Sequence, residues 1–384
     1  MNLYEALPAA LAGLSLALLF WQWLAARRFP LHHRVPDSSF TPAVTLLKPL
    51  KGCDATTAES LQSWFRQDYA GSIQILFGVA DASDPATLAV RELIAGFPDR
   101  DAQLVACPES QGANGKVSTL IQLERLAKHE LILVSDADVR VPRDFLANIV
   151  ALMRDDQTAL VSCFYRLANP GNLAMQCEAI AINADFWSQV LQAVTLKPLD
   201  FALGAAMLTR RRLLTGIGSF TALANCLADD YQLGHRLAQK GHRLALCPVV
   251  VECWEAPMNW HEVWRHQLRW ARTIRACQPL PYFFSILANA TLWPLVSMTT
   301  SLILANAPYL ALIAFGCLLI RVMLARDLQR RLTPERDLAS PSWLVPVKDL
   351  LQAAIWLGAF LGNTVDWRGQ KMRLRRDGTL VEQR

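Results

Sequence analysis

Long apolar runs near both ends of the sequence restrict what this chain can fold into more than any other feature. Leu7 to Ala26 is almost unbroken apolar sequence, and two later runs, Tyr282 to Met298 and Thr300 to Ile320, follow each other closely. About 20 apolar residues cross a bilayer as a helix, and inside lipid a helix satisfies its own backbone polar groups. The sequence therefore predicts an N-terminal membrane anchor and a C-terminal helical hairpin.

A third C-terminal run, Trp343 to Leu361, carries Lys348 and Asp349 near its start. A full span there would put the basic end of the chain outside, against the positive-inside tendency. We therefore expect a re-entrant or interfacial helix and a basic cytosolic tail. Arg27 and Arg28, directly after the first run, place the following segment on the cytosolic side. An integral membrane protein with a cytosolic middle part is expected.

Charge and cysteine usage exclude several other classes of protein. The formal charge of +5 is mild, and basic residues collect beside the apolar runs, which favours an anionic membrane face over nucleic acid as partner. The nine cysteines are odd in number and show no C-x-x-C spacing, so neither a disulfide framework nor a zinc site is indicated. Reduced cysteines also agree with a cytosolic location.

Between residues 41 and 277, short apolar runs alternate with helical patterns. This alternation predicts an α/β domain with a mostly parallel sheet covered on both faces. The expected domains are 1–40 (anchor and linker), 41–277 (cytosolic α/β domain) and 278–384 (membrane region with basic tail). The expected strands are Ala43 to Leu47, Ile73 to Val79, Gln103 to Cys107, Leu131 to Ser135, Ala159 to Cys163 and Arg243 to Cys247.

One predicted strand ends in a pair of acids. Leu131 to Ser135 is followed by Asp136 and Asp138, and ligands in open α/β sheets bind beyond the carboxyl ends of strands. Two such carboxylates can hold a hard divalent cation, although a solvated turn is the simpler interpretation of the pair alone. Asp81 also follows a predicted strand and is a candidate ligand for a base or ribose, whereas Asp84 before Pro85 suits a helix cap.

Three further groups could act on a phosphorylated substrate. Lys116, after two glycines at a helix start, suits a diphosphate, although a surface turn is equally consistent. Asp230, also in a first helical turn, suits general-base chemistry, with capping as the default. The Arg- and Trp-rich helix that contains His266, Arg269 and Trp270 suits either a membrane interface or a diphosphate-binding active site.

Taken together, these motifs resemble glycosyltransferase family 21, the inverting ceramide glucosyltransferases and their bacterial relatives that glycosylate hopanoids. Three spaced aspartates and a Gln/Arg-x-x-Arg-Trp motif carry the resemblance, here Asp81, the segment from Ser135 to Val141, Asp230, and His266-Gln-Leu-Arg-Trp270. His266 departs from the family pattern. The resemblance implies a GT-A fold, a UDP-sugar donor, and a membrane lipid as acceptor.

The resemblance also implies roles for the site residues. Asp230 would be the catalytic base, Asp138 would bind Mg²⁺ or Mn²⁺, and the remaining candidates would bind substrate: Asp81, Lys116, Asp136, His266, Arg269 and Trp270. It places Trp187 and the Asp200 to Gly204 segment where the acceptor could bind, although core packing is the simpler interpretation. The bacterial relatives imply the bacterial inner membrane.

Several functions stay open at this point. Transfer of glucose to ceramide is the first expectation, and transfer of N-acetylglucosamine from UDP-GlcNAc to a hopanoid polyol is an alternative. A processive polysaccharide synthase shares the motifs, but it would need more spanning helices than this sequence offers. A membrane scaffold would leave the acidic motifs and the large domain between the anchors unexplained. No nucleic-acid partner is expected.

Overall fold

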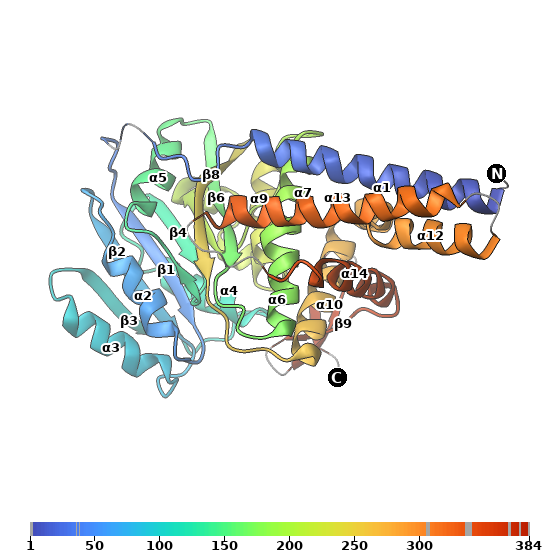
Figure 1. Ribbon diagram of the computed structural model, residues 1–384. Coiled ribbons are helices and arrows are strands. Elements are labelled where there is room, and N and C mark those ends of the chain that lie inside the picture. The colour runs from blue at the N-terminus through green and yellow to red at the C-terminus, as the bar shows by residue number, and fades with distance from the viewer. Residues whose placement is uncertain are drawn as a thin grey trace.

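A computed structural model describes residues 3–35, 37, 39–304, 308–334, 340–367, 370–375 and 378–382. It consists of an α/β body and a helical arm that projects from one side of the body (Figure 1). Helices α1 (Leu3–Arg28), α12 (Leu292–Leu304) and α13 (Tyr309–Leu332) form the arm and contact one another. Segments from opposite ends of the sequence therefore build one unit.

Eight strands form the central sheet, in the order β3-β2-β1-β4-β7-β6-β8-β5. Strands β3, β2, β1 and β4 are mutually parallel, whereas β7 runs antiparallel to both of its neighbours. The bounds are β1 (Val44–Leu50), β2 (Ile73–Val79), β3 (Asp101–Ala106), β4 (Leu131–Ser135), β5 (Val139–Arg140), β6 (Thr158–Leu167), β7 (Ala206–Arg210) and β8 (Arg243–Cys253).

The predicted α/β sheet is confirmed, but it is mixed because β5 and β7 run antiparallel to their neighbours. The sequence analysis did not identify β7. This strand is short and ends in Arg210, a residue type that is rarely buried. In the structure Arg210 is buried and donates a hydrogen bond to the Met153 backbone oxygen at 2.6 Å. Because a charged residue stands at its end, this central strand could not be recognised as buried from the sequence.

Apolar side chains cover both faces of the sheet. Successive residues of a strand point to opposite faces, so Leu46 and Leu133 join one buried cluster, while Leu47 and Ile132 join the other. The helices of the body are α2 (Thr57–Phe65), α3 (Ala86–Gly96), α4 (Gly115–Glu124), α5 (Phe145–Ala151), α6 (Leu173–Ile180), α7 (Trp187–Val194), α8 (Arg211–Gly216), α9 (Asp229–Gln239) and α10 (Trp260–Cys277).

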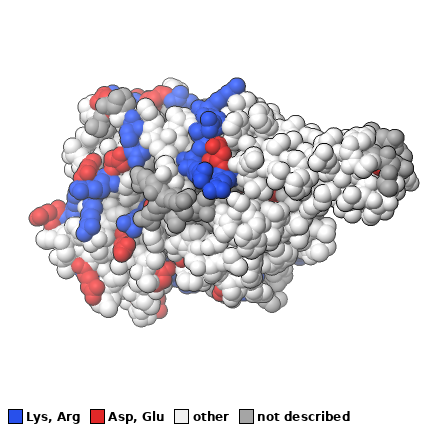
Figure 2. Space-filling view, viewed as in Figure 1, with Lys and Arg blue, Asp and Glu red and all other residues white. Residues whose placement is uncertain are grey.

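Among the described residues, α1 and α13 are long and apolar enough to cross a membrane. Before α12 lie α11 (Pro279–Phe284) and η4 (Ser285–Ala288). The segment Pro279–Ala288 and α12 are bent by 47° relative to each other, and together they would form a third span. In Figure 2 charged residues gather on the body and at the base of the arm, and the arm itself shows almost none on this face. Charge distribution thus agrees with an arm that enters lipid.

The predicted break of the hairpin near Thr299 is wrong. Helix α12 continues through this position to Leu304, and α13 begins at Tyr309. The hydroxyls of Thr299 and Thr300 donate to the backbone oxygens of Leu295 and Val296, one turn earlier, so they are satisfied inside the helix. A further break lies before α12, where the Asn289 side chain accepts from the Leu292 backbone N–H at 2.9 Å.

The segment Trp343 to Leu361, predicted as a re-entrant or interfacial helix, forms α14 (Leu344–Phe360), which contacts α6 and α10 of the body. It is followed by a three-stranded antiparallel sheet of β9 (Thr364–Trp367), β10 (Gln370–Leu374) and β11 (Leu380–Glu382). Backbone hydrogen bonds join this sheet to the body, from Leu380 to Asn225 at 2.7 Å and from Leu227 to Gly378 at 3.2 Å. The C-terminal segment is therefore folded against the loop that precedes α9.

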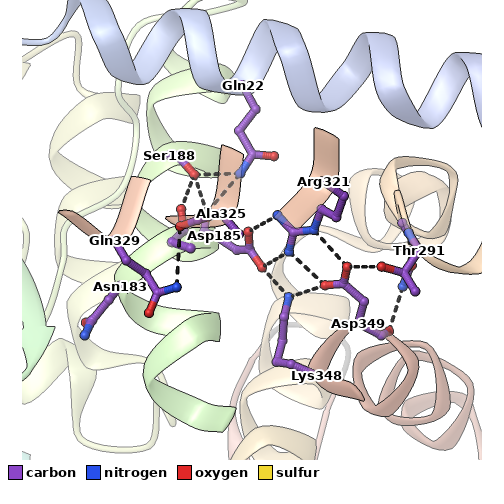
Figure 3. A network of polar contacts seen from close by, with 12 residues as sticks. Gln22, Asn183, Asp185, Ser188, Thr291, Arg321, Ala325, Gln329, Lys348 and Asp349 are labelled. Carbon is purple, nitrogen blue, oxygen red and sulfur yellow. Dashed lines mark hydrogen bonds and ion pairs between the residues drawn. The ribbon is translucent and has the colours of Figure 1, made fainter. Parts of the chain in front are cut away.

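Four buried charged side chains connect the arm to the body (Figure 3). Arg321 of α13 lies between Asp185, in the π-helical segment η2 (Ala181–Phe186), and Asp349 of α14. Lys348 pairs with both carboxylates, and the Thr291 hydroxyl donates to Asp349 at 2.5 Å. Two cations and two anions balance, which makes their burial tolerable.

Candidate active site

The site begins where strand β4 ends. Asp136 and Asp138 follow this strand in a tight turn, closed by a 3.3 Å hydrogen bond from the Val139 N–H to the Asp136 carbonyl. The next residues pair with β8 as strand β5, which fixes the turn on both sides. Because β1, β2 and β4 are parallel, their carboxyl ends share one edge of the sheet. The two predicted acids thus lie at a ligand-binding edge.

A lysine that the sequence analysis missed supports this turn. Lys48 lies fully buried in β1, where it donates to the Ser135 hydroxyl at 3.3 Å and to the Asp136 backbone oxygen. Burial lowers the pKa of Lys48 to about 7, against the opposing effect of the Asp138 and Asp136 carboxylates. Its sequence signal was a lone cation inside an otherwise apolar strand, because such a charge is buried only with partners.

Lys116 joins two acidic motifs that lie far apart in the sequence. Its Nζ lies 2.7 Å from Asp136 Oδ1 and 3.2 Å from Asp229 Oδ2. Asn114 caps helix α4 by accepting from the Val117 N–H at 3.1 Å, which fixes Lys116 in the first turn. Burial alone would lower the pKa of Lys116, but the two carboxylates hold it above its usual value. Lys116 is therefore a fixed cation at the centre of the site.

Asp230 lies in the first turn of helix α9, directly after Asp229 and close to Gly204. Its Oδ1 accepts from the Tyr231 N–H at 2.7 Å, and a Cβ atom on Gly204 would lie 2.8 Å from Oδ2. Burial and the Asp229 carboxylate raise the pKa of Asp230 to about 6. A carboxylate with a raised pKa is a better proton acceptor than an ordinary aspartate, yet it is still ionised at neutral pH.

The charges at this edge suit a divalent cation. Four carboxylates lie at this edge, those of Asp136, Asp138, Asp229 and Asp230, and the lysines near them are Lys48 and Lys116. Burial and the neighbouring Asp136 raise the pKa of Asp138 to about 6, and a bound cation would favour its ionised form. Carboxylate oxygens are the ligands that Mg²⁺ and Mn²⁺ prefer. The donor set therefore fits the predicted cation.

Helix α10 brings the last motif to the site. A capping box between Asn259 and Glu262 fixes its start. The ring of Trp270 lies 4.8 Å from that of His266 and 6.1 Å from that of Phe186, between centroids. His266 Nδ1 lies 2.6 Å from Glu178 Oε1. The charge of Arg269 lowers the pKa of Glu255, which follows β8.

Glu255 shows how close the two parts of the site are. Burial raises the pKa of Glu255 to about 7, and the carboxylates of Glu178 and Asp138 raise this pKa further. The positive charges of His266 and Arg269 lower it. The residue thus responds both to the Asp138 turn and to helix α10. Neither Glu178 nor Glu255 was identified from the sequence. Glu178 lies inside an apolar helix, and the strand before Glu255 was predicted to end at Cys247, whereas β8 continues to Cys253.

Two predicted positions lie apart from this cluster. Asp81 is exposed after β2, and its Oδ1 accepts from the Ser83 N–H and hydroxyl, both at 2.8 Å, which lowers its pKa. Trp187 is fully buried and donates from Nε1 to the Asn183 oxygen at 2.8 Å, so core packing accounts for it. Asp84 accepts from the Ala86 N–H at 2.9 Å and from the Gly52 N–H at 3.0 Å, but the N-cap residue of α3 is Pro85, so the predicted cap position is one residue too early.

Comparison with known proteins decides the family. The model of the glycosyl transferase family 21 matches residues 7–380. The chain belongs to this family. One curated relative is ceramide glucosyltransferase 3 of Caenorhabditis elegans, which is 25% identical over 58% of this chain and 48% of its own length. Another is ceramide glucosyltransferase of Candida albicans, which is 33% identical over 30% of this chain and 23% of its own length. The chain spans about half the length of the Caenorhabditis relative.

A solved structure supports the fold of this family 21 chain. The mannosyltransferase PcManGT from Pyrobaculum calidifontis, in complex with GDP-Man and Mn²⁺, matches with a TM-score of 0.58 and 23% identity. The match covers 92% of this chain and 99% of that protein. The predicted GT-A fold and the resemblance to family 21 are both confirmed, and family membership supports a role in glycosyl transfer.

Proposed function

We propose that this chain is an inverting glycosyltransferase that moves one hexosyl unit from a UDP-sugar to a hydroxyl of a membrane lipid, with glucose and ceramide as the first pair to test. The observation that carries the proposal is Asp230, an acid with a raised pKa held beside Lys116, Asp229 and the Asp136 turn. Membership of family 21 and the helices α1 and α13 support it.

The donor would bind along the sheet edge. Asp136 and the exposed Asp81 would accept hydrogen bonds from the nucleotide, and Lys116 and Arg269 would hold the diphosphate through charge. Asp138 would hold Mg²⁺ or Mn²⁺, which when bound supplies positive charge next to the departing diphosphate. Trp270 and His266, in edge contact at 4.8 Å, would form the acceptor side of the site.

Asp230 would act as the base of a single displacement. The acceptor oxygen forms a bond to the anomeric carbon as the bond from that carbon to the diphosphate oxygen breaks, and the hydroxyl proton passes to Asp230. Oδ2 is suited to this because Oδ1 is already engaged by the Tyr231 N–H. Lys116 and Arg269 would stabilise the negative charge that develops on the leaving diphosphate.

The arm would place this chemistry at the membrane. The basic residues Arg27 and Arg28 end α1, and Arg330 and Arg331 lie in the last turn of α13, so both helices end in positive charge at the body. By the positive-inside tendency the body would face the cytosol, in a bacterial inner membrane. The lipid acceptor could then reach the site from the bilayer surface.

A crossed assay tests the proposal. Membranes that contain the protein or its Asp230→Asn variant are given UDP-glucose, UDP-galactose or UDP-GlcNAc with ceramide or a hopanoid polyol, and lipids are analysed by mass spectrometry. A hexosylceramide made by the parent, and about 10²–10⁴-fold more slowly by the variant with donor binding unchanged, is the expected result. Polymeric product would indicate a synthase, and the absence of product and of UDP release would refute the proposal.

A hopanoid product carrying N-acetylglucosamine would retain the mechanism but change both substrates. The ratio of kcat to KM for each donor, measured with a fixed acceptor, separates sugar preference from lipid preference. Full activity of Asp230→Asn would remove this residue from the mechanism.

A further inference from the structure

Three polar side chains from separate elements meet on the acceptor side of the site. Glu178 lies on α6, Glu255 follows β8, and His266 lies on α10. One carboxylate oxygen from each acid and one imidazole nitrogen all lie within 4.8 Å of one another. The mechanism proposed above uses neither acid, so their convergence calls for a separate explanation.

Glu178 has an unsatisfied oxygen deep in the protein. Its side chain is fully buried, and its Oε1 accepts from His266 Nδ1 at 2.6 Å and from Gln267 Nε2 at 3.0 Å. Its Oε2 has no hydrogen-bond partner in the part of the chain that the structure describes. A buried carboxylate oxygen without a partner is costly and is usually satisfied by something bound.

His266 is oriented by this contact. When Nδ1 donates to a carboxylate, a neutral imidazole presents Nε2 as a hydrogen-bond acceptor. The imidazole is 15% exposed, and the Trp270 ring packs against it. The cluster thus presents acceptors, from two carboxylates and one imidazole, next to an aromatic side chain.

We propose that Glu178, Glu255 and His266 form a subsite that binds further hydroxyl groups of the lipid acceptor, which makes the preferred acceptor a lipid with several head-group hydroxyls. This inference rests on the proposed function and specifies its acceptor class. A hydroxyl donates one hydrogen bond, so a polyol can satisfy Glu178 Oε2 and His266 Nε2 together. The side chain of Trp270 suits the carbon face of such a head group.

A second metal ion fits these groups less well. Both hydrogen-bond donors to Glu178 converge on Oε1, and the interaction with Glu178 occupies His266 Nδ1. The positive charge of Arg269 also acts on Glu255. A divalent cation would be repelled by this guanidinium, whereas neutral hydroxyls would not be.

Two acceptors of equal chain length test the subsite in the full-length protein. Hexadecan-1-ol offers one hydroxyl, and hexadecane-1,2,3-triol offers three. With the best donor from the crossed assay, we expect a higher kcat/KM for the triol than for the alcohol. Glu178→Gln should raise the KM for the triol by about tenfold or more and leave the KM for the alcohol and for the donor unchanged. Exposed Glu92→Gln is the control.

Other outcomes would overturn the inference. An equal loss with both acceptors would show a structural role for Glu178. If Glu178→Gln does not fold, as judged by thermal unfolding, Glu255→Gln decides by the same comparison of KM values. Fewer Mn²⁺ ions bound per chain in Glu178→Gln, without substrates, would identify a metal site instead. A parent that uses both acceptors equally refutes the subsite alone. The absence of UDP release with these two acceptors, with ceramide and with the hopanoid polyol refutes the proposed function.

Discussion

Arg321→Met should destabilise the protein more than removal of any exposed cation. The Arg321 guanidinium donates to Asp349 twice at 2.8 Å, and to Asp185 at 3.1 and 2.8 Å. Both carboxylates and Arg321 itself are buried. Methionine keeps much of the volume but leaves Lys348 as the one cation of the four-residue network for two buried carboxylates.

The expected cost follows from the uncompensated charge. Breaking a buried ion pair by removal of one partner costs about 3–5 kcal/mol. One kcal/mol shifts the midpoint of thermal unfolding by about 2–4 °C in a protein of moderate size, so a decrease of about 6–20 °C is expected. Asp349→Asn added to Arg321→Met should recover part of this loss, because Lys348 and Asp185 then balance.

Thermal unfolding in detergent, followed by tryptophan fluorescence, measures the effect. The matched control is Arg143→Met, which removes an exposed pair with Asp68, 74% and 61% exposed, and should cost at most about 1 kcal/mol. Equal midpoints for Arg321→Met and Arg143→Met would refute the reasoning. No recovery in the double variant would show that the cost is not electrostatic.

Three further predictions concern the site. Gly204→Ala should lower kcat and leave the donor KM unchanged, because the new Cβ would lie 2.8 Å from Asp230 Oδ2. The control is Gly216→Ala, whose Cβ would meet no atom within 4 Å, and equal kcat values for the two variants would contradict the geometry. The pKa of Asp230 is raised to about 6, and a general base acts only when it is ionised. The kcat should therefore be constant above about pH 7 and fall about tenfold per pH unit below about pH 6. A kcat that stays constant down to about pH 5 would exclude Asp230 as the base. Chelation by EDTA should abolish transfer and Mn²⁺ should restore it, whereas Asp138→Asn should require more Mn²⁺; EDTA-resistant turnover would exclude the cation.

The acidic pairs were accessible from the sequence because each directly follows or begins a regular element. The apolar strand that ends at Ser135 and the helix that begins at Asp229 both have clear local signals, so Asp136, Asp138 and Asp230 could be identified. A lysine at a helix start after glycines was equally visible. These features depend on residues close together in the sequence, which is why they could be read without the fold.

Contacts between distant residues could not be read in this way. Lys48 lies fully buried under the Asp136 turn, and Glu178 lies opposite His266, 88 positions away in the sequence. A buried charge carries no periodic signal, and its partners are determined by how the elements pack. The same applies to β7, whose buried Arg210 resembles a surface residue in the sequence.

By itself the sequence determined the family, the α/β class, the acids at the sheet edge and the presence of apolar helices at both ends, since these depend on local pattern. Only the tertiary structure decided that β7 enters the sheet antiparallel, that α12 continues past Thr299, and that Arg321 pairs with Asp185 and Asp349. The physical reason is that burying a charge or a polar group is favourable only when its partners are in place, and the packing of distant elements supplies them.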